Sequence, residues 1–213
     1  MIKTIIFIAG LSLFHLACHA QITAVTGTGD EVILYDNHTW KYANKTDTET
    51  AAIQTNKTNF KKSSSSGFEV SSNIVNNVKI YINPKKWTFK KGEEGSSAEY
   101  NFTHVGKNEA YGMIISERVQ IPLLSLRDLA LKNASNAAPD IKVVNEEYRN
   151  VNGTQVLFIQ FTGTISGMNF TYFNYYYSCE RGTIQLLTYT FTNLANENKP
   201  EMEELLNGLV INY

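Results

Sequence analysis

The chain has few cysteines, few prolines and no excess of charge of either sign. It contains two cysteines and four prolines, and its formal net charge is −1 at pH 7. One cysteine, Cys18, lies in an N-terminal segment that we expect to be removed, so Cys179 would remain alone and no disulfide could form within the mature chain. Because a nearly neutral chain has no long-range attraction to phosphate, nucleic acid and anionic membrane surfaces are poor partners.

The apolar run at the N-terminus, Ile5–Leu16, is shorter than the roughly 20 residues that span a bilayer. It follows the basic Lys3 and precedes a small residue, Ala20, which is the arrangement of a secretory signal peptide. We predict a signal peptide over residues 1–20, cleaved between Ala20 and Gln21. The mature protein would then be exported to the periplasm or the cell exterior, with no transmembrane span.

Cys18 leaves a second interpretation of the N-terminus open. A bacterial lipoprotein is cut directly before a cysteine that then carries lipid. Ala17 fits such a site, but His15 stands where a leucine is usual. Lipidation at Cys18 is therefore the alternative, and it would tether the mature protein to a membrane.

Two short units precede the main domain. Residues 21–43 contain the alternating runs ITAVT, EVILY and TWKYA, separated by turns rich in Gly, Asp and Asn. This pattern predicts a small β-hairpin or three-stranded meander, which is too small to form a core alone. Residues 44–66 are polar, lack periodicity and end in a serine run, so we predict a flexible linker there.

Residues 67–213 have the pattern of one α+β domain, an antiparallel β-sheet flanked by helices. Apolar residues alternate with polar ones in many short segments, and turn residues separate these segments. The predicted strands are 78–82, 87–90, 98–105, 111–119, 141–149, 154–165, 168–179 and 183–192.

Two helices are expected against this sheet. Ser125 and Asp128 have the spacing of a capping box, a Leu/Ala face follows them, and Pro139 ends the run. The second helix is expected to begin at Pro200, with glutamates in its first turns, and to end at Leu209. The last residues, 210–213, would extend along the sheet edge.

The segment 168–179 is the most aromatic of the predicted strands. Phe170, Tyr172 and Tyr176 share one face, and Phe173 and Tyr175 share the other. Aromatic residues on both faces favour a central strand that is covered on both sides. The alternative is an exposed surface on which a sugar or peptide stacks.

Residues from about 78 to 211 resemble the PsbP-like superfamily. The resemblance rests on the run Ile82-Asn83-Pro84-Lys85-Lys86-Trp87, a helix that opens with Leu124-Ser125-Leu126, and an Asn152-Gly153 turn. The long strand with Phe173-Asn174-Tyr175-Tyr176-Tyr177 and the terminal helix complete it. The resemblance implies an α/β sandwich and a role as an assembly, stabilising or adaptor module without catalysis. It places no metal ligand on this chain.

Residues 31–42, EVILYDNHTWKY, look like a hairpin at the front of exported proteins of Bacteroidetes-type bacteria. That hairpin is usually written with Asp-Gly before Thr-Trp, and here Asn37-His38 stands in its place. Both pairs tolerate the positive φ of a tight turn, Asn better than His. The resemblance implies export in a bacterium of this type.

Residues that could carry chemistry are sparse. The two histidines of the mature chain, His38 and His104, have no Cys, Asp or Glu at metal-ligand spacing. Glu117 and Arg118 are the polar candidates, because one of them would face inward if the strand continued, and a buried charge needs a partner. We predict no catalytic, cofactor-binding or metal site.

Three hypotheses for function follow. The first is a non-enzymatic exported module that binds an envelope protein or a small ligand. The second is an envelope enzyme with a site built around Glu117, Arg118 and Glu180. The third is a carbohydrate- or lipid-binding face, which requires several of the tyrosines in 172–177 to be exposed.

Overall fold

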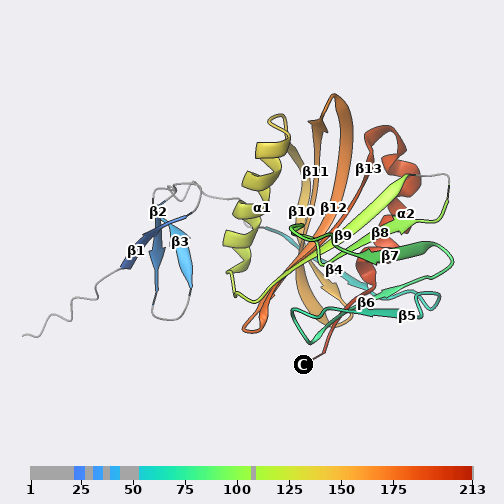
Figure 1. Ribbon diagram of the computed structural model, residues 1–213, viewed down its shortest axis with the longest axis horizontal. Helices are drawn as coiled ribbons and strands as arrows, with labels where there is room; N and C mark the ends of the chain where they lie inside the picture. The colour runs from blue at the N-terminus through green and yellow to red at the C-terminus, as the bar shows by residue number, and fades with distance from the viewer. Residues whose placement is uncertain (1–21, 27–30, 36–38, 44–52, 107–108, 213) are drawn as a thin grey trace, which may run out of the picture.

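A computed structural model describes residues 22–26, 31–35, 39–43, 53–106 and 109–212. Its two helices and its strands form one large sheet, a small sheet packed against it, and a separate meander near the N-terminus (Figure 1). The fold is α+β, as predicted. The predicted signal peptide, with Cys18 and the expected cleavage site at Ala20 and Gln21, and the turn with His38 lie outside the described residues.

The large sheet has eight strands in the order β4-β10-β11-β12-β13-β9-β8-β7. Neighbours in it are antiparallel except β4 and β10, which are parallel. The strands are β4 (Thr55–Phe60), β7 (Trp87–Lys91), β8 (Tyr100–His104), β9 (Ala110–Glu117), β10 (Lys142–Val151), β11 (Thr154–Ile165), β12 (Met168–Cys179) and β13 (Gly182–Phe191).

One face of the large sheet is covered by the small sheet and by helix α2 (Ala195–Asn207). The small sheet has the order β14-β6-β5, formed by β5 (Phe68–Ser71), β6 (Val78–Ile82) and β14 (Leu209–Ile211). A short 3-10 turn, η1 (Thr192–Leu194), leads into α2. Ile80, Phe158, Tyr175 and Leu206, all at most 1% exposed, belong to the core between these layers. We call this side the α2 face.

The opposite side of the sheet, the α1 face, carries helix α1 (Leu123–Ala137). Leu126 and Ala130 pack there with Leu157, Ile159 and Tyr176 of β11 and β12. In Figure 1, α1 runs alongside β10 and β11 and leaves β8 and β9 without a covering helix. The α1 face is therefore covered on one half only.

The N-terminal meander predicted over 21–43 is present as β1 (Ile22–Val25), β2 (Glu31–Leu34) and β3 (Trp40–Tyr42). Trp40 of this meander contacts the main domain. The Ser125 hydroxyl donates a hydrogen bond to the Trp40 carbonyl at 3.3 Å, and the Trp40 side chain packs against the cluster beneath α1.

The prediction of a flexible linker over 44–66 is wrong at residues 55–60, which form β4; residues 44–52 lie outside the described part. The guanidinium of Arg149 holds this strand. Its central carbon lies 4.4 Å from the Phe60 ring centroid and 3.6 Å from that of Phe158, and its Nε contacts Glu147 at 2.6 Å. The polar sequence of β4 lacks the alternation typical of a strand. The segment is nevertheless a strand, because its backbone pairs with that of β10.

Both helix starts differ from the prediction. No side-chain cap is present at α1, because the Ser125 hydroxyl is bound to Trp40 and Asp128 pairs with Arg127 at 3.0 Å. Helix α2 begins at Ala195 rather than Pro200. Its early turn is held by Asn198, which is fully buried and donates to the Thr190 hydroxyl at 2.8 Å. Neither helix therefore begins at the residue that the sequence pattern predicted.

Candidate binding cleft

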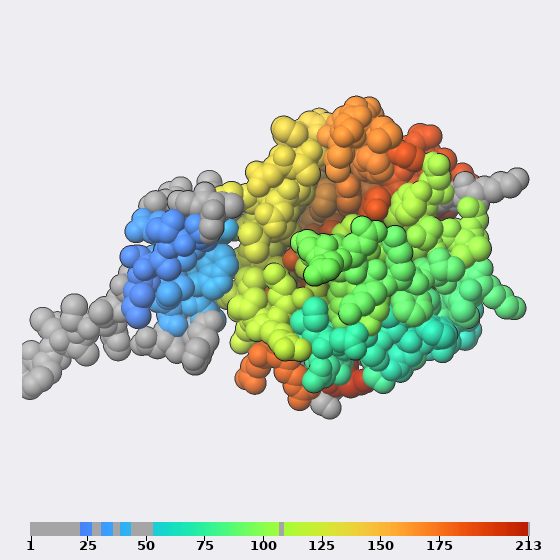
Figure 2. Space-filling model, viewed as in Figure 1, coloured from blue at the N-terminus to red at the C-terminus, as the bar shows by residue number. Residues whose placement is uncertain are grey.

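A cleft of about 320 Å³ lies between α1 and the uncovered half of the α1 face. Figure 2 shows it as a hollow between the yellow helix and the green strands, with orange strands at its floor. Aliphatic and aromatic side chains dominate its lining. The lining residues include Met113, Ile115, Leu129, Ala130, Ala134, Ala137, Ile141, Phe161, Tyr172, Tyr176 and Leu187. We call this space the α1 cleft.

The cleft exists because the helix presents short side chains to the sheet. Ala130, Ala134, Ala137 and Ala138 all line it, so the side of α1 that faces the sheet cannot fill the gap. At one end the helix approaches closely, since a Cβ added to Gly163 would lie 2.8 Å from the Ala138 Cβ. Glycine there permits the close contact that closes this end of the cleft.

Few polar groups line the α1 cleft. Tyr176, which is 1% exposed, accepts a hydrogen bond from the Asn174 side chain at 3.4 Å. Burial raises the pKa of Tyr176 far above its usual value, so its hydroxyl keeps its proton at neutral pH. Ser97, Glu117, Asn133 and Gln185 are the other polar residues of the lining.

A row of stacked aromatic rings crosses the α1 face beside the cleft. The ring centroids of Phe161 and Tyr172 lie 4.8 Å apart, those of Tyr172 and Tyr189 5.4 Å, and those of Tyr189 and Tyr111 5.4 Å. These residues come from β11, β12, β13 and β9, which are neighbours in the sheet. We call this row the aromatic ladder. Each pair has the offset geometry that aromatic rings prefer.

The predicted cover on both faces of β12 is complete over only part of the strand. Residues 173–177 are buried, but Phe170 and Tyr172 are only half-buried, as are Tyr111 and Tyr189. Burial, and then the neighbouring tyrosine, raise the pKa of Tyr172 and of Tyr189. Neutral rings with partly accessible edges therefore remain beside the cleft.

The structure separates the three polar residues of the enzyme hypothesis. Glu117 is exposed and lines the cleft at the end of β9. Arg118 is also exposed, and its Nε donates to the Ile74 carbonyl at 3.3 Å. Glu180 is exposed in the turn after β12, and neither it nor Arg118 lines the cleft. The strand ends at Glu117, so the condition under which one of the pair would face inward, a strand that continues through Arg118, is not met.

The His104 side chain is mostly buried, with 11% of its surface exposed. Its ring lies 5.1 Å from that of Trp87, and its Nε2 is 3.8 Å from a Glu201 oxygen. Within the described residues, no group of three or more His, Cys, Asp and Glu side chains is placed to hold a metal ion. Nor does any helix in the described part have the length and apolar character needed to cross a bilayer.

The sequence did not identify the residues that form the cleft. Alanines at 130, 134 and 137 recur at helical spacing and predict a buried helix face, but they do not show that the space opposite is unfilled. The ladder depends on strand register, in which Tyr189 lies opposite both Tyr172 and Tyr111. The one indication in the sequence was the number of aromatic residues in the predicted strands.

No protein-family model and no curated protein matches the sequence. Among solved structures, cyanobacterial PsbP (CyanoP) from Synechocystis matches with a TM-score of 0.51 and 12% identity, over 68% of this chain and 92% of that one. LpqN, described as involved in cell envelope biogenesis of Mycobacterium tuberculosis, matches with a TM-score of 0.49 and 8% identity, over 64% and 83% of the two chains.

A Pseudomonas aeruginosa protein of unknown function, described as a putative regulator, also matches. Its TM-score is 0.45 at 12% identity, over 68% of this chain and 97% of that one. At such identities the likeness to CyanoP concerns the fold alone. The resemblance in the sequence is confirmed at that level: the chain has the PsbP-like fold.

Proposed function

We propose that this protein is a non-enzymatic, exported module of the bacterial cell envelope that binds a small, elongated apolar ligand in the α1 cleft. The observation that carries the proposal is the cleft itself. Its volume of about 320 Å³ lies within the roughly 300–1,000 Å³ of ligand pockets. Its lining combines a predominantly apolar wall with a few polar groups, as small-molecule sites do.

The chemistry of the lining supports binding rather than catalysis. Among the described residues that line the cleft, Glu117 is the one carboxylate, and no His, Lys, Arg or Cys accompanies it. General acid and base catalysis usually relies on a His, Asp, Glu or Lys side chain within hydrogen-bond reach of the proton that is transferred. The binding free energy of an apolar ligand comes instead from removing its surface from water, which contributes about 25 cal/mol for each Å² of apolar surface buried.

The small side chains of α1 provide the test. The mature chain is titrated with the neutral fluorophore N-phenyl-1-naphthylamine, whose emission rises in an apolar site. Ala134→Leu adds three carbons inside the cleft, so we expect it to weaken binding at least about tenfold, the cost of displacing buried apolar contact. The matched control is Asn136→Leu, which adds a leucine at an exposed position of the same helix.

Three results would contradict the proposal. The wild-type protein could fail to bind the fluorophore, Ala134→Leu could bind it as well as wild type does, or the two leucine variants could weaken binding equally. Thermal melts of both variants establish that each is folded before the affinities are compared.

A further inference from the structure

The aromatic ladder ends at Tyr111, and the strand beyond it carries no ring on that face. Tyr111 pairs with Thr103 of β8, and Met113 pairs with Asn101. Residues that pair across antiparallel strands share a face of the sheet. One side of the Tyr111 ring stacks on Tyr189, and on the other side the neighbouring strand offers the short polar Thr103 and Asn101.

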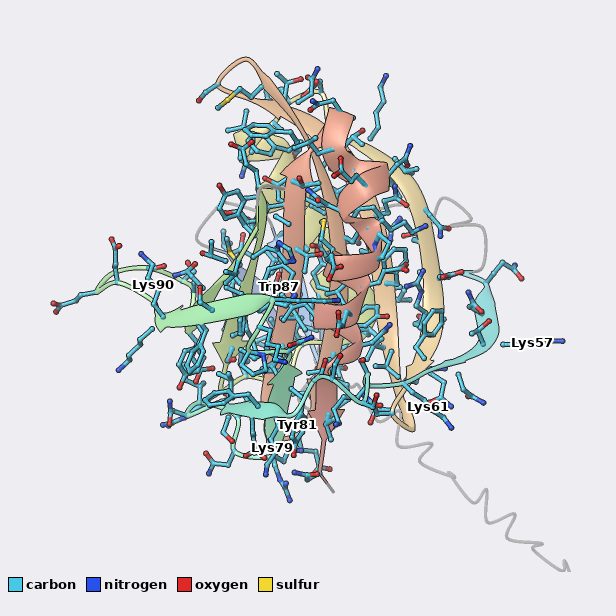
Figure 3. All side chains as sticks on the ribbon, turned by 90° about the vertical axis from the view of Figure 1, so that its right-hand side faces the viewer. Lys57, Lys61, Lys79, Tyr81, Trp87 and Lys90 are labelled. Carbon is cyan, nitrogen blue, oxygen red and sulfur yellow. The ribbon has the colours of Figure 1, made fainter. Side chains whose placement is uncertain are left out.

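A second hollow, of about 340 Å³, lies at this end of the ladder. Its rim contrasts with the α1 cleft, because hydroxyl, amide and charged groups surround the two tyrosines. It is lined by Lys90, Glu93, Ser96, Asn101, Phe102, Thr103, Tyr111, Gly112 and Tyr189. Figure 3 shows Lys90 on β7, with its side chain at the margin of the molecule. We call this space the polar hollow.

Among the described residues that line the polar hollow, one positive and one negative side chain balance in charge. Lys90 and Glu93 form an ion pair at 3.5 Å, and both side chains are well exposed. The other polar groups are uncharged hydroxyls and an amide, which donate and accept hydrogen bonds. An anion would meet Glu93 and a cation would meet Lys90, so the hollow suits a neutral ligand rich in hydroxyl groups.

We infer that the polar hollow is a sugar subsite, in which a neutral pyranose ring stacks on the free face of Tyr111 and hydrogen-bonds to Asn101 and Thr103. A pyranose has one apolar face of C–H groups and a rim of hydroxyls. The apolar face matches an aromatic ring, and the rim matches the polar groups beside it. The inference rests on the proposed function, because the subsite lies next to the α1 cleft.

The α1 cleft and the polar hollow adjoin, so one ligand that fills both would have an apolar part and a polar part. Tyr111 lines the polar hollow and Met113 lines the cleft, two residues apart on the same face of β9. Tyr189 and Leu187 have the same relation on β13, and Ser96 and Ser97 are adjacent. The ligand class is therefore a neutral glycolipid, with its apolar chain in the α1 cleft and its sugar against Tyr111.

Two probes with the same chain separate the subsites. Octyl β-D-glucoside and triethylene glycol mono-octyl ether, both kept below their micelle concentrations, are titrated calorimetrically into the mature chain. Both should bind, and the glucoside about tenfold more tightly, which is the contribution of one stacked ring. Tyr111→Leu should remove the preference for the glucoside and leave the affinity for the ether within about twofold.

Two further variants keep the test decisive. Tyr111→Phe retains the ring face and should retain the preference. Tyr81→Leu removes a tyrosine from β6 of the small sheet, which Figure 3 places beside Lys79, and should change neither affinity. Equal affinities of the wild type for both probes would overturn the sugar subsite and leave the apolar site standing. Failure of both probes to bind would overturn the two together, and an unchanged preference in Tyr111→Leu would overturn the role of Tyr111.

Discussion

The two faces of the large sheet differ in how they are covered. On the α2 face, a helix and a small sheet bury large side chains such as Trp87, Phe158 and Leu206, each at most 1% exposed. On the α1 face, one helix with an alanine-rich side covers half of the sheet and leaves a cleft and a ladder of half-buried rings. The comparison teaches that stability is concentrated on one face, which leaves the other free to bind.

Leucine truncations should reveal the largest difference between the faces. Leu206→Ala removes a fully buried side chain from the α2 face and should lower the free energy of unfolding by about 2–5 kcal/mol. Leu187→Ala, in the lining of the α1 cleft, removes the same atoms from a half-buried position and should cost roughly 1 kcal/mol. Urea denaturation measures the free energy of unfolding of both variants. Equal losses would show that the two faces contribute equally to stability.

Two arginines on opposite faces provide a second test. Arg149, on the α2 face, lies between Phe60 and Phe158, and its side chain is 7% exposed. Arg149→Met should lower the free energy of unfolding by about 3 kcal/mol, because Glu147 loses its buried partner. Arg127, on the α1 face, pairs with Glu146 at 2.7 Å at the margin of the helix, and Arg127→Met should cost roughly 1 kcal/mol. Chemical denaturation measures the free energy of unfolding of both variants. A larger loss for Arg127→Met than for Arg149→Met would contradict the greater contribution of the α2 face to stability.

Alkaline titration tests the burial of the α2 face. Burial raises the pKa of Tyr175 from 10.0 to about 12, with Arg149 opposing part of that rise. The unfolded chain therefore loses this proton at lower pH than the folded chain, and the stability that Tyr175 contributes is full below pH 10.0 and is lost as the pH rises toward 12. Unfolding monitored between these pH values should show the loss in wild type and a smaller one in Tyr175→Phe. Equal losses would show that other groups cause it.

The smallest effect on stability is expected inside the cleft. Ala134→Leu adds apolar atoms to unfilled space rather than to a packed core, so the midpoint of thermal unfolding should stay within about 2 °C of that of the wild type. This would separate loss of ligand binding from loss of fold. A drop comparable to that of Leu206→Ala would show that the cleft is closed in solution.

Long alternating segments made much of the fold predictable. The segments 154–165 and 168–179 coincide with β11 and β12, because a dozen residues rich in aromatic and β-branched side chains, ended by Gly-containing turns, specify a strand locally. The prediction failed at β4, where no residue of TNKTNF except Phe60 signals burial. It also failed at the start of α2, where the fully buried Asn198 side chain donates a hydrogen bond to Thr190 in the first turns of the helix.

The sequence by itself determined the strands of the central sheet and the α+β class, because these depend on residue pattern and turn chemistry that neighbouring residues carry. Short motifs such as Ile82–Trp87 carried the resemblance to the PsbP-like fold. Only the tertiary structure decided that β4 joins the sheet, that alanines of α1 leave a cleft, and that Tyr111, Tyr189 and Tyr172 form one ladder. Each of these depends on contacts between residues distant in the chain, and on the space that remains unfilled once those contacts are made.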